Sequence, residues 1–525
     1  MSASSRASEA SRAGYPRPTS ASNYPTPLAA PNILAPLVRP PSTSPPPLPF
    51  RPPIVPPPGW TSSSHVIPAA YPRRWKQCFG SLSRESRPFT KDRPDPDEGR
   101  AERAERNNVE ARRVIRMRYQ AQESEVDWET VPRSERPEGL WIAGECWRRE
   151  GRGEKGEGVT LIVTHANGFT KESWIPTIRR LLARGPAPAS SSFGELSTTE
   201  DSGRVNFGSS GSSADARVGA AVDIDEIWFL DDVHHGASID LNAGLIGPVH
   251  PWSDGGRDIL NLIQHVLPLP ERPEREALEW REETPGRKRK IIGVGHSFGA
   301  NALVQAAHAR PDLFHALFLA EPMCPPVAPS ADADDFESGN MRWVLVSGAI
   351  KRRGIWPDLA SAASTRSSPF FASWNDEVWD LWLSHGIIPL EPGELHVSST
   401  RHGPVQLATP PWAEAAVFAE PTAMAEGWDK LAEINVPVGF VIGGDAQATT
   451  GEENTREMVW RAPEAKNERI MDAGHLVSTD GHGHEHEHEH EHEHEHEHEH
   501  EHEHEHEHEH EHEYGHWHEP EFETP

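Results

Sequence analysis

Short apolar runs alternate with amphipathic stretches between residues 139 and 472. The run VTLIVT at 159–164 is β-branched and bounded by charged and glycine-rich turns, which is typical of a buried parallel strand. SWIPTIRRLLA follows it with the apolar spacing of an amphipathic helix. The alternation continues with expected strands at 139–147, 226–232, 290–295, 315–322, 436–444 and 467–472, and with helices between them at 255–267, 298–310, 427–434 and 452–462. Repeated strand–helix units predict an α/β fold with a mostly parallel sheet covered by helices on both faces.

Two stretches interrupt this alternation. Residues 184–222 are mostly Ser, Gly, Ala and Asp, which indicates a flexible insertion. Residues 323–425 are rich in Pro, Ser and Trp and separate two strand–helix units, so we interpret them as a lid inserted into the domain.

Both ends of the chain have a biased composition. About one residue in ten is proline, and most of the excess over the usual ~5% lies before residue 100. We therefore expect 1–105 to be a disordered Pro/Ser-rich segment. At the other end, 481–525 is expected to be a disordered repeat of His and Glu. This repeat supplies about half of the formal net charge of −30, so the charge says little about the partners of the folded part. The remaining 106–480 is predicted to form the folded domain.

The three cysteines are widely spaced, which does not suggest a disulfide framework and favours a reducing compartment. No segment approaches the ~18 consecutive apolar residues of a membrane span, and the N-terminus lacks an apolar signal-peptide core. The first 84 residues are rich in Ser and Arg and poor in acids, a faint likeness to organellar transit sequences. We expect a cytoplasmic location by default, with a peroxisome or another organelle as the alternative.

The stretch IIGVGHSFGANALV at 291–304 contains a G-x-S-x-G pattern between a predicted strand and a predicted helix. In that context the serine sits on a sharp turn that exposes its hydroxyl above the sheet. Gly295 and Gly299 would allow the turn to pack closely. We therefore predict that Ser297 is a nucleophile, the alternative being a glycine-rich connection without catalytic function.

A serine nucleophile needs a base, and hydrolases of this kind place nucleophile, acid and histidine in that order along the chain. His475, in the loop DAGHLV after the last predicted strand, is the candidate base. For the acid we prefer Asp445, which follows the second-to-last strand. Glu321, at the end of the strand after the nucleophile helix, remains the alternative.

The developing oxyanion needs two backbone N–H donors. One is expected from Phe298, directly after the nucleophile. The other is expected from the loop HANGFTKESW, where Gly168 would occupy a tight turn and Phe169 would offer its N–H.

Other polar residues carry weaker signals. His296 and the pair His234 and His235 are predicted to be structural. The His–Glu repeat offers ligand atoms for weak binding of divalent metals, without the geometry of a specific site. The sequence predicts neither a cofactor nor a specific metal site, and the basic residues form no clear patch for nucleic acid.

The motifs HANGFTKESW, DDVHHGASIDLN, GHSFGA, AEPM and AGHL, in this order, resemble a fungal branch of the α/β-hydrolases that includes a peroxisomal lipase and the AK-toxin biosynthesis hydrolases. The resemblance covers about 110–480 and implies an α/β-hydrolase fold with a lid. It also implies that Ser297 and His475 act as nucleophile and base. The chain ends in EFETP, which is not a Ser-Lys-Leu peroxisomal address.

Together these patterns predict a serine hydrolase of the esterase or lipase type that cleaves an acyl ester or a related carbonyl substrate through an acyl-enzyme. Stacked tryptophans in the lid favour an apolar small-molecule substrate, the alternative being that they only pack the lid against the core. The alternatives are a hydrolase-fold protein that works by binding, and a secondary-metabolism hydrolase that acts on a C–C or thioester bond.

Overall fold

The structure of the chain is a computed structural model. It describes residues 14–19, 24, 27–30, 32–41, 44–83, 99–123, 128, 130–151, 158–183, 222–267, 276–282, 289–327, 340–390, 403–444 and 450–478. Nearly all of the expected insertion at 184–222 and the whole His–Glu repeat lie outside these residues. The expectations for both therefore stay predictions.

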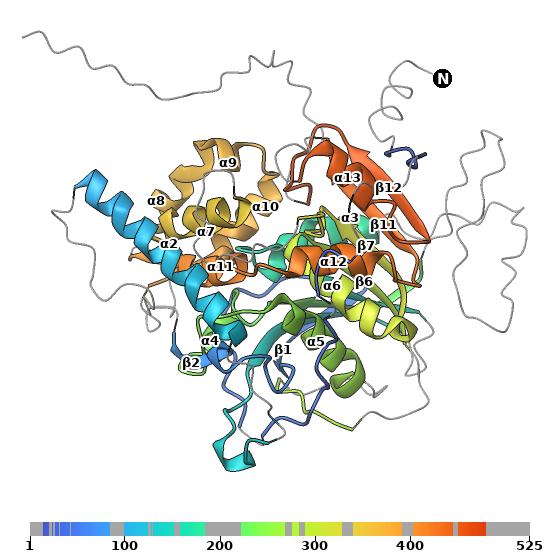
Figure 1. The fold of residues 1–525 in the computed structure, drawn as a ribbon, viewed down its shortest axis with the longest axis horizontal. Helices are drawn as coiled ribbons and strands as arrows, with labels where there is room; N and C mark the ends of the chain where they lie inside the picture. Colours follow the sequence, from blue (N-terminus) through green and yellow to red (C-terminus); the bar gives the residue numbers. More distant parts are fainter. Residues whose placement is uncertain are drawn as a thin grey trace, which may run out of the picture. The chain divides into compact units, whose positions relative to one another are not determined.

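The main sheet has eight strands in the spatial order β1-β3-β5-β4-β6-β7-β11-β12 (Figure 1). Strands β4 to β7, β11 and β12 are mutually parallel, whereas β3 pairs in the antiparallel sense with both of its neighbours, β1 and β5. The strands are β1 (Trp60–Pro68), β3 (Trp141–Arg149), β4 (Val159–Thr164), β5 (Ile224–Leu230), β6 (Lys290–His296), β7 (Phe314–Ala320), β11 (Val438–Gly443) and β12 (Ala465–Ile470). The predicted mostly parallel sheet is confirmed.

Helices cover both faces of this sheet because successive strand residues point to opposite sides. On one face, side chains such as Ile162 and Leu317 pack against the apolar stripes of α5, α6 and α12. On the other face, Leu161 and Val163 pack against α3. The covering helices are α3 (Ile175–Ala183), α5 (Trp252–Asn261), α6 (Phe298–Ala309), α12 (Ala423–Leu431) and α13 (Glu452–Met458).

The N-terminal part corrects the expectation that 1–105 is disordered as a whole. Trp60–Pro68 forms the edge strand β1, which pairs along its full length with β3. Only its last four residues are buried, so the apolar pattern is too short to be recognised in the sequence. Prolines are tolerated next to it because an edge strand has one side without ladder hydrogen bonds. The folded unit therefore begins before residue 106.

The helix α2 (Arg100–Glu123) also crosses that predicted boundary (Figure 1). It packs against α7 and α11. Its buried Arg118 forms an ion pair with Glu420 at 2.7 Å, and the guanidinium lies over the Trp75 ring. Because a buried charge without a partner is strongly destabilising, the pairing of Arg118 with Glu420 fixes α2 to the domain.

The segment between β7 and α12 forms a separate layer of short elements, several of which lie together in Figure 1. A small sheet in the order β8-β10-β9 holds it together. Its elements are α7 (Met341–Lys351), β8 (Ile355–Trp356), α8 (Leu359–Ala363), α9 (Pro369–Ala372), α10 (Asp376–Leu381), β9 (Ile387–Pro389), β10 (Val405–Leu407) and α11 (Pro411–Phe418). This segment corresponds to the predicted lid, and we call it the lid below.

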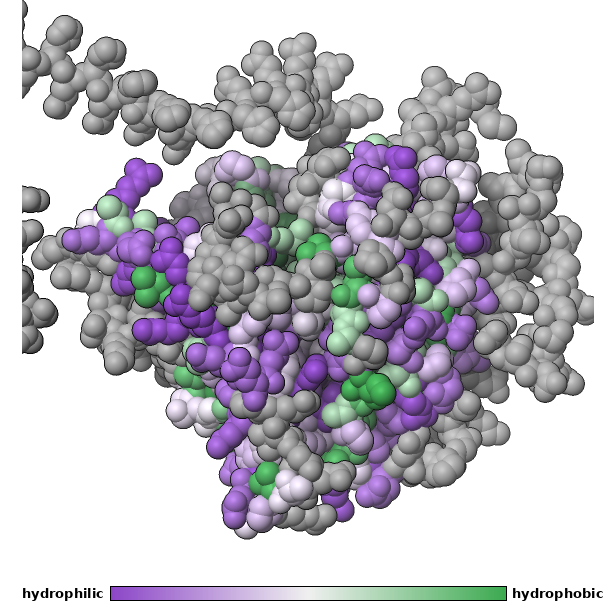
Figure 2. Space-filling view, viewed as in Figure 1, coloured by the Kyte–Doolittle hydropathy of each residue, from purple (hydrophilic) through white to green (hydrophobic). Residues whose placement is uncertain are grey.

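On the face drawn in Figure 2, hydrophilic residues cover most of the coloured surface and hydrophobic ones form small separate groups. The large apolar side chains lie inside, on both faces of the sheet. Among the described residues no helix combines the length and apolar character that a bilayer crossing requires.

Candidate active site

Ser297 occupies a strained turn between β6 and α6. Its φ of 54° and ψ of −117° lie in a region that non-glycine residues rarely adopt. The turn is held by two hydrogen bonds, in which the Ser297 N–H donates to the Ala320 carbonyl at 3.0 Å and the Met323 N–H donates to the Ser297 carbonyl at 3.2 Å. This conformation is the one expected of a nucleophile elbow.

The two glycines around Ser297 are required by close packing. A Cβ on Gly299 would come within 2.5 Å of the His165 carbonyl oxygen. A Cβ on Gly295 would come within 2.8 Å of the Ala300 Cα. Helix α6 can therefore start directly against the end of β4 only because both positions lack a side chain.

His475 connects two other residues by its ring nitrogens. Its Nε2 lies 3.0 Å from Ser297 Oγ, and its Nδ1 lies 3.1 Å from Glu321 Oε2. The three residues come from the ends of β6, β7 and the loop after β12, so the parallel sheet brings them to one edge. The histidine ring is partly exposed, while Ser297 and Glu321 are buried.

Glu321 is held on both sides of its carboxylate. Its second oxygen, Oε1, accepts a hydrogen bond from the Gly443 N–H at 2.6 Å. Its backbone has a positive φ of 43°, and its N–H donates to the Val441 carbonyl at 2.9 Å. The structure thus brings Glu321, the alternative acid predicted from the sequence, to His475. Asp445, the preferred candidate, lies outside the described residues.

His296, predicted to be structural, contacts the loop that carries His475. Its Nε2 donates to the His475 carbonyl at 2.9 Å, and its Nδ1 lies 2.9 Å from Ser478 Oγ. Burial, aided by the nearby His475 ring, lowers the pKa of His296 to about 3, so the ring stays neutral. His296 thus supports the position of His475, a role that nothing in the sequence signals beyond its place beside Ser297.

The loop after β4 lies beside the elbow, and the N–H groups of Gly168 and Phe169 both have hydrogen-bond partners. Gly168 has the positive φ of 79° that a tight turn requires. Its N–H donates to His235 Nε2 at 3.2 Å, and the Phe169 N–H donates to the Ala166 carbonyl at 3.2 Å. Phe298 is the first residue of α6, where helix N–H groups have no partner within the helix.

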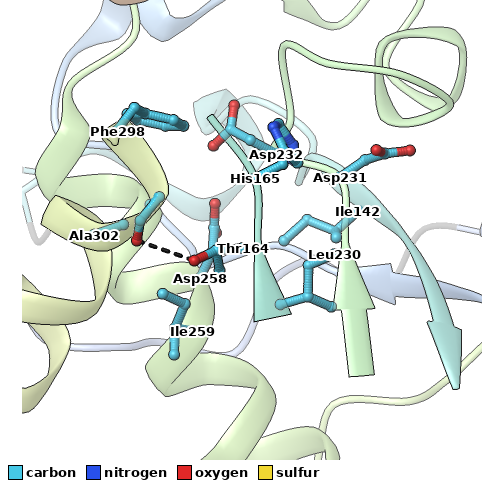
Figure 3. A pocket seen from close by; sticks show the side chains of 12 residues that line it. Ile142, Thr164, His165, Leu230, Asp231, Asp232, Asp258, Ile259, Phe298 and Ala302 are labelled. Carbon is cyan, nitrogen blue, oxygen red and sulfur yellow. Dashed lines mark hydrogen bonds between the residues drawn. The ribbon is translucent and has the colours of Figure 1, made fainter. Parts of the chain in front are cut away.

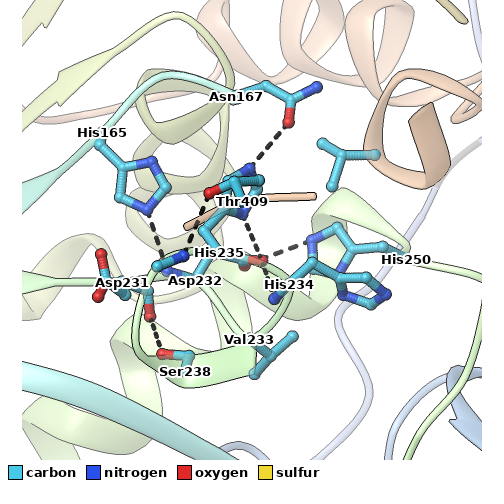
Figure 4. Close-up of polar contacts among 12 residues, drawn as sticks. His165, Asn167, Asp231, Asp232, Val233, His234, His235, Ser238, His250 and Thr409 are labelled. Carbon is cyan, nitrogen blue, oxygen red and sulfur yellow. Dashed lines mark hydrogen bonds and ion pairs between the residues drawn. The ribbon is translucent and has the colours of Figure 1, made fainter. Parts of the chain in front are cut away.

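A buried polar network fixes this loop from below. Lys171 forms ion pairs with Asp231 at 3.0 Å and with Glu172 at 2.6 Å, which explains the KE pair of the motif. His235 Nε2 lies 2.8 Å from Asn167 Oδ1, and its Nδ1 lies 3.3 Å from Asp232 (Figure 4). The prediction that His235 is structural agrees with these contacts, although they reach Asn167 and Gly168 of the loop after β4 directly.

The aromatic core of the lid lies against residues that flank the site. The Phe169 ring stacks on Trp374 with ring centroids 5.4 Å apart, and Leu476, the neighbour of His475, packs against the same cluster. Four tryptophans of the lid are buried among one another, namely Trp356, Trp374, Trp379 and Trp382. Their faces are therefore used in packing the lid.

A small cavity of about 30 Å³ lies beneath the site, between β4, β5 and α6 (Figure 3). Phe298, Thr164, His165 and the carboxylates of Asp232 and Asp258 line it. This volume suits a single water molecule and is too small for a substrate.

Comparison with known proteins gives partial sequence matches to fungal proteins. The type I acyl-CoA thioesterase mpaH of Penicillium roqueforti is 27% identical over 199 residues, which cover 36% of this chain and 41% of that protein. The peroxisomal membrane protein LPX1 of Saccharomyces cerevisiae is 26% identical over 175 residues, or 33% of each chain. The chain thus matches less than half the length of these curated relatives. No family model matches it.

Among solved structures, the peroxisomal α/β-hydrolase Lpx1 of Saccharomyces cerevisiae aligns over 80% of this chain and 85% of its own, with 15% identity and a TM-score of 0.48. The observed strand order, the elbow at Ser297 and the order Ser297, Glu321, His475 along the chain are those of an α/β-hydrolase. The chain is therefore a protein with the α/β-hydrolase fold, and parts of its sequence are similar to these fungal proteins.

Proposed function

We propose that the protein is a serine hydrolase that cleaves an activated acyl group, with Ser297 as nucleophile, His475 as base and Glu321 as orienting acid. The observation that carries this proposal is the continuous hydrogen-bonded chain from Ser297 Oγ through both nitrogens of His475 to the Glu321 carboxylate. Such a chain lets the imidazole accept the serine proton while the carboxylate stabilises the imidazolium that forms.

In the first half of the reaction, Ser297 Oγ bonds to the acyl carbon as its proton moves to His475 Nε2. The tetrahedral intermediate collapses when the bond to the leaving group breaks and His475 returns the proton to that group. Water then attacks the acyl-enzyme with His475 again as base, which releases the acid and free Ser297. The reaction requires only the groups named here and water.

The oxyanion would be held by the Phe298 N–H and by one amide of the loop after β4. The Gly168 and Phe169 amides have internal partners in the structure, at 3.2 Å each. Both are long hydrogen bonds, so release of one costs little. We propose that substrate binding frees the Phe169 N–H, because the Phe169 ring also contacts the lid and would respond to a change there.

The substrate class is an acyl ester or an acyl thioester with an apolar acyl chain. The apolar preference rests on the lid, whose aromatic core adjoins Phe169 and Leu476. The thioester is a specific second candidate because three of the matched fungal relatives are named acyl-CoA thioesterases. A protein that binds such a ligand without turning it over is the competing proposal.

The test is hydrolysis by the full-length chain of two substrates with the same octanoyl group, one a coenzyme A thioester and the other an oxyester. A series of shorter and longer acyl chains then measures the apolar preference. Ser297→Ala is the matched control, since it removes one oxygen from a side chain that is 6% exposed. Turnover of either substrate that disappears in this variant supports the proposal. A folded chain that binds the substrates without turnover would favour the binding protein.

A further inference from the structure

A second group of polar side chains lies behind the elbow and takes no part in the proposed reaction. Asp232 and His234 belong to the loop after β5, and His250 precedes α5. One ligand atom from each lies within 4.8 Å of the other two, and His250 Nε2 is 3.4 Å from Asp232 Oδ2 (Figure 4). We call these three residues the Asp–His–His cluster.

Two ring nitrogens in this cluster are buried without a hydrogen bond. They are His234 Nδ1 and His250 Nε2, on side chains that are 1% exposed. His234 Nε2 lies 3.1 Å from the Gly247 carbonyl and must donate to it, so Nδ1 carries the lone pair. A buried acceptor without a partner destabilises the fold, and a bound ligand would remove that cost.

The charges around the cluster would accommodate a cation, because one buried carboxylate has no lysine or arginine as its partner. Each neighbouring buried carboxylate faces a lysine or an arginine: Asp231 and Glu172 share Lys171, Asp254 faces Arg257, and Asp258 faces Arg73. Asp232 differs from these, because within the described residues its ion-pair contacts are only with the imidazoles of His235 and His250. Asp232 is thus the carboxylate of this group that no lysine or arginine side chain faces within ion-pair distance in the described residues.

We propose that Asp232, His234 and His250 form a binding site for one divalent metal ion of the Zn²⁺ type. Two imidazoles and a carboxylate are ligands that Zn²⁺ commonly takes, with bond lengths near 2.0–2.2 Å. A tetrahedral ion needs ligand atoms about 3.3 Å apart at these lengths, and the Asp232–His250 pair is already at 3.4 Å. The Gly247 carbonyl orients the His234 ring, as carbonyls often do for metal-binding imidazoles.

The ion would be structural, since its three ligands take no part in the hydrogen bonds that join Ser297, His475 and Glu321. The Phe298 ring packs edge-on against His250 at 5.6 Å and stacks on His235 at 5.9 Å. A metal here would join the loop after β5 to the segment before α5, directly under the residue that follows the nucleophile. The inference stands independently of the reaction proposed above.

The experiment measures Zn²⁺ retained by the full-length chain after loading with zinc chloride and gel filtration in a mild chelator. The His–Glu repeat is the same in every variant, so its contribution cancels in the differences. We expect His250→Gln and Asp232→Asn each to retain one equivalent less than the unmodified chain. His265→Gln, whose ring is buried and bonded to the Arg281 carbonyl, is the matched control and should retain the full amount.

A second measurement covers the case in which a variant folds poorly. The unmodified chain loaded with one equivalent of Co²⁺ should show the intense visible absorption of a tetrahedral site, and His250→Gln should lose it. Equal Zn²⁺ retention in all variants, together with only the weak spectrum of octahedral Co²⁺ in the unmodified chain, would overturn the proposal. The cluster would then be an Asp232–His250 ion pair only.

Discussion

Replacement of Glu321 by Gln tests the proposed acid with a change of one atom. The Gly443 N–H, 2.6 Å from Oε1, requires an acceptor at that position. The amide oxygen of Gln must therefore stay there, which places the new NH₂ group where Oε2 now lies 3.1 Å from His475 Nδ1. The opposite orientation would set two donors against each other at Gly443.

This orientation fixes the wrong tautomer of His475. An amide that donates to Nδ1 leaves the imidazole proton on Nε2. Because Nε2 faces Ser297, the protonated nitrogen cannot accept the serine proton. In a serine protease the comparable change lowers kcat about 10⁴-fold, which corresponds to ~5.4 kcal/mol of barrier. If the Gln amide turned over, the Gly443 N–H would lose its acceptor, and an unpaired buried donor costs about 1–3 kcal/mol. We therefore expect kcat to fall by about 10³–10⁴.

The assay is the steady-state hydrolysis of the better octanoyl substrate by Glu321→Gln and Asp445→Asn, with thermal unfolding as a check on folding. The account predicts the large loss for Glu321→Gln and less than a tenfold change for Asp445→Asn. A Glu321→Gln enzyme within tenfold of the unmodified one, or a larger loss in Asp445→Asn, would refute the assignment of the acid.

The remaining predictions concern His296, the close packing of α6 at Gly299 and the edge strand β1. His296→Gln should lower kcat about tenfold at constant KM, through loss of the contact with the His475 carbonyl; an unchanged kcat would contradict the positioning role. Because burial lowers the pKa of His296 from 6.5 to about 3, this residue contributes stability above pH 6.5 that is lost as the pH falls toward 3. In His296→Gln the unfolding free energy should therefore change less with pH between pH 6 and 4, by about 1.4 kcal/mol per pH unit, as measured by urea titrations. An equal slope in the unmodified chain and in His296→Gln would argue against a neutral buried ring. Gly299→Ala should destabilise by about 1–3 kcal/mol in the same assay, whereas Gly348→Ala on an open helix position should be neutral or stabilising; similar values for both would contradict the close approach of α6. Deletion of residues 1–98 should abolish soluble expression, since it removes β1 and exposes the edge of β3; a soluble product with an unchanged Tm would show that β1 is dispensable.

The central strands could be predicted from sequence because burial on both faces leaves continuous apolar runs. VTLIVT coincides with β4, and the pattern around Ser297 lies at the predicted strand-to-helix turn. The edge strand β1 could not be recognised, since its solvent-exposed half is a run of serines and its buried half is four residues long. The boundary drawn at 105 failed for the same reason.

Only those residues of the candidate site could be predicted whose position after a predicted strand indicates their role. Ser297 and His475 follow from their places after predicted strands, whereas the choice between Glu321 and Asp445 depends on which strand end approaches the histidine loop. That distance is a tertiary property, as are the contacts of His296 and the convergence of Asp232 on His250. Sequence spacing carries no signal for either.

The most direct test of the central claim is labelling of the full-length chain with a short fluorophosphonate, followed by mass spectrometry of its peptides. Such probes react with a serine only when a neighbouring base activates it. We expect one modified residue, Ser297, and no labelling at that peptide in Ser297→Ala or after His475→Gln. A folded chain without a label, or a label that persists in Ser297→Ala, would contradict the claim that this fold carries an activated serine.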